Sequence, residues 1–311
     1  MSLIERLALL APLATLAQRR LRVLLAPQQL LCVVRQGSRL VEGSAQHIAV
    51  DGAGGHWQAS IDALRTLLQQ PDIAAARLPL EVSLSGRWSQ LVLAPWSDAL
   101  LSEPSASRFL QTQLAALYGD NARGWSVVGD DAPYGHTRLV CGVDSTLLQA
   151  LKDVAAECGH ACRVIEPLLG TALRAQQASQ PRLPRKGTAA ATGALALIEP
   201  GRITMAALRD NRIVAIQSQP ASETWRLELP QAWQRWTLRA PELAGIEQVA
   251  VTDLSALPAA VAATPSAAAL HLVPGALPPR FRLDANPFGE HAAIAVAATR
   301  QPPAASPEVA A

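Results

Sequence analysis

The side chains that could carry out chemistry lie far apart in this sequence. The tightest group is Cys158, His160 and Cys162, three residues of types that bind metal ions. Gly159 stands where a helix should end, so the two cysteines belong to different elements and face different ways. The CxxC spacing of a zinc or redox site is missing, and we favour buried, reduced cysteines of a cytosolic protein over a metal site.

Two polar segments suggest other kinds of site. Asp130 and Asp131 form an acidic pair in a polar loop, where a solvated loop tip is a simpler interpretation than a general acid and base. The glycine-rich segment 51–55 precedes a predicted helix, but it lacks the lysine and the serine or threonine of a P-loop. The chain has neither a GxSxG nor an HExxH motif. We therefore predict no catalytic residues and no bound metal.

The composition is that of a globular protein large enough for two lobes. The chain has 311 residues, of which 50% are hydrophobic and 17% charged, and its net charge is +2. The 27 basic residues are spread along the chain instead of forming a stripe with interleaved aromatic residues. No nucleic-acid partner is predicted.

The N-terminus is the place where a membrane contact is worth weighing. Residues 7–17 are uncharged, but about 20 residues are needed to span a bilayer. Glu5 and Pro12 argue against a signal peptide. Residues 1–20 are predicted to form a short helix that packs on the protein, with a helix that docks on a membrane surface or a partner as the alternative. No later segment has 18 consecutive apolar residues, so no membrane span is predicted.

The hydrophobic pattern predicts an α/β protein. A meander of strands opens the chain, a helix follows, and strands and helices then alternate up to a second hairpin. The predicted strands are 22–26, 30–36, 39–50, 80–84, 88–94, 125–128, 137–143, 162–165, 194–219 (a hairpin), 249–252 and 269–273. The predicted helices are 57–70, 102–118, one capped at its N-terminus by Asp144 or Ser145, one after 167, and 225–238. Pro230 predicts a break in the last of them.

This order of elements resembles the actin-like ATPase fold, and in particular the PilM-type proteins of type IV pilus assembly, with the related MshI and the cytoplasmic domain of GspL. Three stretches carry the resemblance: EVSLSGRWSQLVLAPW, TRLVCGVDSTLLQALKDVAAECGHACRVIEP and ALALIEPGRITMAALRDNRIVAIQSQ. The resemblance implies a two-lobe fold with a small inserted α/β subdomain in the first lobe. The implied divisions are an N-terminal helix (1–20), a first lobe (21–85 and 166–180), the insertion (86–165), a linker (181–192), a second lobe (193–285) and a flexible tail (286–311).

The nucleotide site that this resemblance implies is degenerate. The family has Asp-x-Gly and a lysine in its first hairpin, whereas residues 26–30 here read APQQL. The second hairpin reads Glu199-Pro200-Gly201, so Glu199 and Gly201 are the closest remnants of a metal and phosphate site. A proline has no amide to offer to a phosphate, and the late chain has no Gly-Gly pair. We therefore expect no cofactor, with binding of ATP and Mg²⁺ as the disfavoured alternative.

The resemblance also implies a function. It predicts a non-catalytic scaffold, a pseudo-ATPase in the cytoplasm at the inner membrane, that binds the cytoplasmic tail of a PilN-like membrane protein. Trp96 and Trp125 flank the insertion and are predicted to contact a partner, and the insertion is a candidate surface for self-association. The alternatives are an active ATPase or kinase-like enzyme with an unusual site around Glu199, and a peripheral membrane protein that acts through its N-terminal helix.

Overall fold

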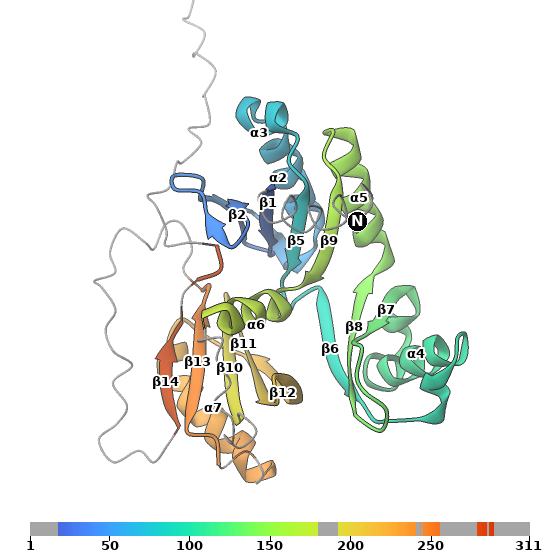
Figure 1. The fold of residues 1–311 in the computed structure, drawn as a ribbon. Helices are drawn as coiled ribbons and strands as arrows, with labels where there is room; N and C mark the ends of the chain where they lie inside the picture. The colour runs from blue at the N-terminus through green and yellow to red at the C-terminus, as the bar shows by residue number, and fades with distance from the viewer. Residues whose placement is uncertain are drawn as a thin grey trace, which may run out of the picture.

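The computed structural model describes residues 18–179, 192–240, 243, 245–255, 279–284 and 286–288. These residues form three β-sheets with helices packed on them (Figure 1). The predicted N-terminal helix apart from its last residues, the linker apart from Thr192, the strand 269–273 and most of the tail lie outside the described residues. Thr192, assigned to the linker, is the first residue of a strand. Arg19 and Arg20, assigned to the N-terminal helix, instead begin the first strand.

The first sheet has the strand order β3-β2-β1-β5-β9, and β4 pairs with β2. The opening strands are antiparallel, whereas β1, β5 and β9 are parallel to one another. The strands are β1 (Arg19–Leu25), β2 (Gln29–Gln36), β3 (Arg39–Leu40), β4 (Gln46–Ala49), β5 (Leu80–Leu84) and β9 (Cys162–Pro167). The predicted strand 80–84 is confirmed with the same bounds.

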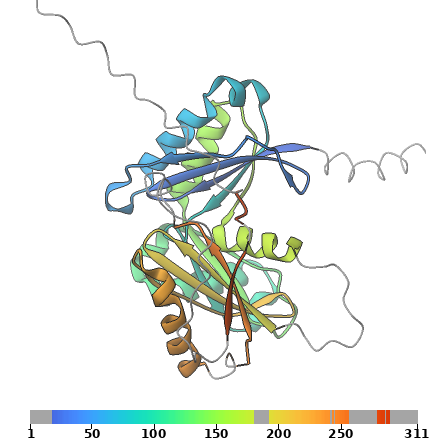
Figure 2. The same ribbon diagram turned by 90° about the vertical axis from the view of Figure 1, so that its left-hand side faces the viewer.

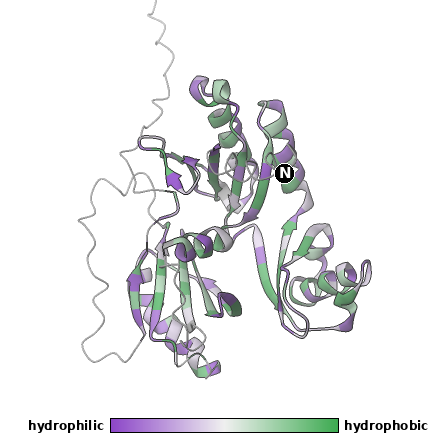
Figure 3. Ribbon diagram, viewed as in Figure 1, coloured by the Kyte–Doolittle hydropathy of each residue, from purple (hydrophilic) through white to green (hydrophobic). Residues whose placement is uncertain are grey.

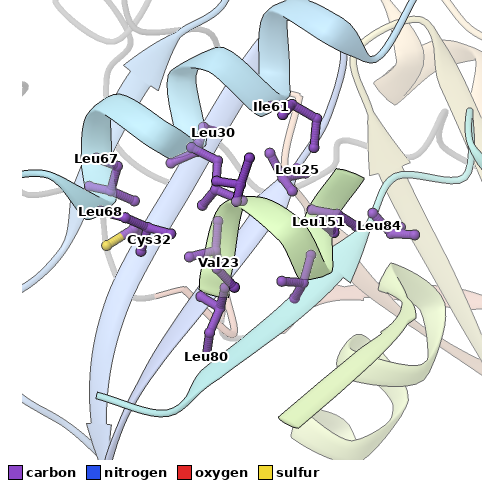
Figure 4. Close-up of a cluster of buried hydrophobic side chains, with 14 of the residues drawn as sticks. Val23, Leu25, Leu30, Cys32, Ile61, Leu67, Leu68, Leu80, Leu84 and Leu151 are labelled. Carbon is purple, nitrogen blue, oxygen red and sulfur yellow. The ribbon is translucent and has the colours of Figure 1, made fainter. Parts of the chain in front are cut away.

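Helices α2 (Gln58–Leu68) and α5 (Ser145–Glu157) cover one face of this sheet, and α3 (Pro71–Ala76) follows α2. Alternate residues of β1, such as Val23 and Leu25, point to this side because strand side chains alternate between faces. They meet Ile61 and Leu67 of α2 and Leu151 of α5 in one buried cluster (Figure 4). In Figure 3, helix α5 carries both hydrophobic (green) and hydrophilic (purple) residues, as expected for a helix with a single apolar stripe.

The second sheet repeats the strand order of the first. Its order is β12-β11-β10-β13-β14, with an antiparallel meander followed by two parallel strands. Its strands are β10 (Thr192–Glu199), β11 (Arg202–Arg209), β12 (Arg212–Pro220), β13 (Gln248–Asp253) and β14 (Arg280–Leu283). The sequence analysis missed β14.

Helix α7 (Trp225–Arg239) packs on the second sheet and runs through Pro230 without the predicted break. Trp225, Trp233 and Trp236 are buried against the sheet, and this packing outweighs the cost of the proline. The hydrogen bond that Pro230 cannot make would join Arg226, which is exposed, so water can replace it.

The third sheet is small and lies beside the other two (Figure 1). Its strands β6 (Ser89–Ala94), β7 (Trp125–Gly129) and β8 (Arg138–Asp144) pair in the order β6-β8-β7, and α4 (Ser105–Tyr118) packs on them. Three short 3-10 helices complete the described elements: Ala53–Gly55, Asp98–Leu101 and Gly119–Gly124. The range 86–165 for the insertion is corrected at its end, because α5 packs on the first sheet and β9 pairs with β5.

Helix α6 (Leu168–Ser179) lies between the first and second sheets, as Figures 1 and 2 show from two sides. Its Leu168 and Leu169 share a buried cluster with Leu31 of β2 and Leu197 of β10. Phe288, which the sequence analysis placed in a flexible tail, is buried in the same cluster. The two sheets therefore meet through an apolar interface as well as through a helix.

The N-terminus of α5 offers a test of local structure. Asp144 caps the helix, since its carboxylate accepts a hydrogen bond from the Thr146 amide at 2.8 Å. We expect Asp144→Ala to lower the free energy of unfolding by about 1 kcal/mol, because the amide loses its acceptor. Urea unfolding would measure the loss, with Asp153→Ala, an exposed position in the same helix, as the control. Equal losses in the two variants would contradict the capping role.

Within the described part of the chain, none of the helices is long and apolar enough to cross a membrane.

Candidate functional site between the two sheets

A cleft of about 390 Å³ opens where the first hairpins of the two sheets face each other. Three segments of the first sheet and its connections form one wall, and the second sheet forms the other. The lining residues are Ala26, Pro27, Gln28, Gly52, Gly54, Gly55, Ser85, Arg87, Glu199, Pro200, Gly201, Arg202, Ser218, Gln219 and Pro220. The structure thus brings together the two turns that the sequence analysis compared, although Pro27 and Glu199 are 172 positions apart in the sequence.

The turn between β10 and β11 places Glu199 at the cleft. Glu199 pairs with Arg202 across the hairpin, so only Pro200 and Gly201 form the turn. Pro200 fixes its own φ angle, and Gly201 has a φ of 75°, which side chains other than glycine rarely allow. The sequence Glu-Pro-Gly-Arg therefore ends β10 at the edge of the cleft, with the Glu199 carboxylate among its lining groups.

The turn between β1 and β2 is held rigidly against the glycine-rich segment. The Ala26 amide donates to the Gln29 carbonyl at 3.0 Å, and the Val50 amide donates to the Gln28 carbonyl at 3.0 Å. Gly52 lies so close that a Cβ atom there would be 1.9 Å from the Pro27 carbonyl oxygen. The DGAGG segment thus packs on a turn.

Gln29 begins β2 and reaches the second sheet. Its side chain is 1% exposed, and its Nε2 donates to the Leu254 carbonyl at 2.7 Å. Both Gln28 and Gln29 belong to the stretch APQQL, where the resemblance implies a phosphate site. The Gln28 residue lines the cleft, whereas the side chain of Gln29 makes the contact between the sheets.

Glu199 is buried, although it carries a carboxyl group. It is 3% exposed, and the Gly86 amide nitrogen lies 3.2 Å from its Oε1 and 3.1 Å from its Oε2. Burial raises the pKa of the Glu199 carboxyl, while hydrogen bonds from Ser85 and Gly86 and the charge of Arg202 act in the opposite direction. A buried carboxylate thus joins the second sheet to the turn after β5.

Comparison with known proteins bears on the fold. No model of a known protein family matches the chain, and no curated protein matches its sequence. Among solved structures, a PilM-PilN type IV pilus biogenesis complex matches with a TM-score of 0.56 at 10% identity, covering 76% of this chain and 81% of that one. A Bacteroides thetaiotaomicron protein of unknown function, described as having an actin-like ATPase fold, matches with a TM-score of 0.49 at 10% identity and covers 77% and 83%. The chain has an actin-like ATPase fold.

The cytoplasmic domain of EpsL, an inner membrane component of the Vibrio cholerae type II secretion system, is also similar. It matches with a TM-score of 0.46 at 16% identity, over 77% of this chain and 84% of that domain. At such identities the likeness is one of fold alone.

An actin-like ATPase fold implies Mg²⁺ and ATP between its lobes, but the residues of this cleft do not fit them. Both turns carry a proline, Pro27 and Pro200, where an amide would face a phosphate. Glu199 is the one carboxylate among the lining residues, and the Gly86 amide already binds it. No three metal-binding side chains gather within the described residues.

The two tryptophans predicted to contact a partner lie on the third sheet and are half-buried. The Trp96 ring lies 4.5 Å from that of Tyr134, measured between centroids, and Trp125 lies 5.1 Å from Tyr118. Trp125 also packs on Gly142, where a Cβ atom would be 2.7 Å from its ring. Both side chains contribute to the core of the third sheet, and their contact with a partner stays a prediction.

The remaining sequence candidates lie outside the lining of the cleft. His160 Nδ1 lies 2.9 Å from the Leu78 carbonyl oxygen. Cys158 follows the last residue of α5 and Cys162 begins β9, and both thiols are free but half-buried instead of buried as predicted. Asp130 accepts a hydrogen bond from the Leu139 amide at 3.0 Å and lies 3.5 Å from Arg212.

Sequence reasoning missed Arg87 and Arg202, which line this cleft, and Gly86, which binds Glu199. The signal for Gly86 is a small residue two positions after the buried strand β5. Nothing local links it to Glu199, because their contact spans 113 residues of sequence.

Proposed function

We propose that the protein is a non-catalytic actin-like scaffold on the cytoplasmic side of an inner membrane, where it binds the cytoplasmic N-terminal tail of a PilN-like protein in type IV pilus or related secretion machinery. The observation that carries the proposal is the likeness in fold to a chain of the PilM-PilN complex. The cleft that does not fit Mg²⁺ and ATP supports the non-catalytic part.

A groove between the first and third sheets offers a place for the tail. Its volume is about 270 Å³, and β7 and β9 form its two sides with α5 between them. Each of these strands lies at the edge of its sheet in the part of the chain described here. Val128 on β7 is 64% exposed and Val164 on β9 is 39% exposed. A sheet edge beside exposed apolar side chains suits an extended peptide, which adds main-chain hydrogen bonds and buries its own apolar residues.

The test is a titration with a synthetic peptide of the cytoplasmic tail of the PilN-like protein from the same organism, followed by calorimetry. We expect binding to the wild-type chain and at least a roughly tenfold weaker affinity for Val164→Arg, because a buried guanidinium without a partner offsets the apolar contact. Val214→Arg on β12 is the matched control, since Val214 is also 39% exposed and lies outside the groove.

The outcomes separate two locations for the tail. A loss with Trp96→Ala and none with Val164→Arg would move the tail to the third sheet, in line with the sequence-based prediction for Trp96. A tail that binds none of the variants and not the wild type would refute the scaffold proposal. Self-association through the third sheet belongs to the same proposal, and sedimentation of the wild-type chain would reveal it.

The non-catalytic part has its own measurement. We expect labelled ATP with Mg²⁺ not to bind at millimolar concentration, since the cleft offers no free carboxylate for the metal. Saturable binding that Glu199→Ala abolishes would show an active nucleotide site instead.

A further inference from the structure

The contact between Glu199 and Gly86 joins two parts of the fold and requires a glycine at position 86. Glu199 ends β10 in the second sheet, and Gly86 lies in the turn that leaves the first sheet for the third. A Cβ atom on Gly86 would lie 2.9 Å from Glu199 Oε2, so a side chain there would collide with the carboxylate. Gly86 has an ordinary φ angle, so the glycine is needed for space.

The carboxylate stands between two cavities. The first is the cleft described above, and the second, of about 280 Å³, lies between β6 and the second sheet. Glu199, Arg202 and Ser218 line both. Because the same side chains line both spaces, the Glu199 carboxylate separates them where the three sheets come together.

Several groups around Glu199 are of the kinds that bind an anion, although the site is buried. The Gly86 amide donates to it, Ser85 lines the same cleft, and Arg202 from β11 supplies a nearby positive charge. Across the two cavities it faces Arg87 from the turn after β5 and Tyr118 from α4. An amide, a hydroxyl and a guanidinium are the groups with which proteins bind small oxyanions.

We propose that Glu199 is a built-in ligand: its carboxylate fills an oxyanion site formed by Ser85, Gly86 and Arg202, and thereby fastens the second sheet to the turn that leads into the third. When the side chain is removed, a free small carboxylate such as formate or acetate takes its place. This inference concerns how the sheets are held together and does not depend on the proposed partner.

The first experiment is chemical rescue of the purified full chain. Glu199→Ala is expected to lower Tm, and sodium formate or acetate is expected to restore part of the loss relative to sodium chloride at equal ionic strength. The wild-type chain, whose site is filled, and Glu247→Ala, an exposed glutamate of the same lobe, are expected to show no such gain. Equal gains in all three proteins, or no loss of Tm in Glu199→Ala, would overturn the proposal.

A second measurement works even where Glu199→Ala does not fold. In wild type and Glu199→Gln labelled with ¹⁵N-glycine, the Gly86 amide resonance is expected to differ, because the neutral amide is a weaker acceptor than the carboxylate. The resonance is expected to move with pH in the wild type as Glu199 titrates and to stay constant in Glu199→Gln. Identical pH profiles in the two proteins would show that Gly86 does not sense the Glu199 charge.

The pH dependence of stability has a definite sign. Because burial raises the pKa of Glu199, the folded chain binds a proton at this carboxyl more tightly than the unfolded chain does. The stability that this proton adds to the fold is complete below the ordinary carboxyl pKa and is lost as the pH rises through the raised pKa. The Tm of Glu199→Gln is therefore expected to rise relative to wild type over this interval, and an unchanged difference would contradict a buried titrating carboxyl.

Discussion

Gly52→Ala is expected to lower the free energy of unfolding by about 3 kcal/mol, the upper end of the usual cost of overpacking. The new Cβ atom would lie 1.9 Å from the Pro27 carbonyl oxygen and 2.9 Å from its carbonyl carbon, and both are backbone atoms. The turn around Pro27 cannot move aside cheaply, because Ala26 and Val50 hold it with hydrogen bonds to Gln29 and Gln28. Urea unfolding of the two proteins, followed by circular dichroism, would measure the difference.

Substitutions at two other glycines serve as controls that separate the effect of crowding from that of backbone strain. Gly54→Ala places its Cβ in open space, but Gly54 has a φ of 71°, so we expect a loss of about 1 kcal/mol. Gly124→Ala meets no atom within 4 Å and has no positive φ, so almost no change is expected. A loss for Gly52→Ala no larger than that for Gly54→Ala would show that the segment 51–55 does not pack tightly on the Pro27 turn.

Local pattern was enough for the elements that bury an apolar face. All five residues of β5 are buried, and its continuous run LEVSL was found with its exact bounds. Helix α5 was found because an apolar stripe follows a capping residue, which the sequence left open between Asp144 and Ser145 and the structure shows to be Asp144. In both cases the residues themselves carry the information, because burial against a neighbouring layer selects their type.

Pattern failed where pairing with a distant segment decides the structure. Strand β14 reads RFRL and is mostly exposed, so only its ladder with β13 makes it a strand. Helix α5 and strand β9 follow β8 directly in sequence, but the chain has by then returned to the first sheet. A return of this kind leaves no mark on composition or periodicity, so the end of the insertion could not be read from the sequence.

The cleft was half predictable for the same reason. The two turns at Pro27 and Glu199 could be found, since prolines and glycines mark hairpins and the hairpins belong to a duplicated pattern. The role of Glu199 as the acceptor of the Gly86 amide could not be predicted, because a carboxylate at the end of a strand is equally consistent with a metal ligand. Its contact with Gly86 depends on how the three sheets meet, which is a property of the whole fold.

Glu81→Ala is expected to cost about 3 kcal/mol of unfolding free energy, the lower end of the range for breaking a buried ion pair. Glu81 lies 2.8 Å from Arg20 and 2.7 Å from Arg22, and its side chain is 11% exposed. Arg20 also stands directly opposite Arg35 on the neighbouring strand, and like charges in this position repel. Without the carboxylate, three guanidinium groups would share one face of the first sheet.

Urea unfolding would measure the loss in Glu81→Ala, with Glu157→Ala as the control. Glu157 is 58% exposed and pairs with Arg65 at 3.3 Å, a contact worth about 0.5 kcal/mol.

The pH dependence of the Glu81 effect distinguishes a charge from a packing contribution. Burial alone would raise the pKa of Glu81, but hydrogen bonds from Arg20 and Arg22 outweigh it and hold the pKa below its ordinary value. The stabilisation is therefore complete above the ordinary carboxyl pKa and is lost as the pH falls through the lowered value, the reverse of the behaviour expected for Glu199. The difference between wild type and Glu81→Ala should shrink on acidification, while that between wild type and Glu199→Gln should change in the opposite sense. A difference at Glu81 that does not depend on pH would assign its effect to packing, because removal of a methylene group and a carboxyl group costs the same at every pH when no charge is involved.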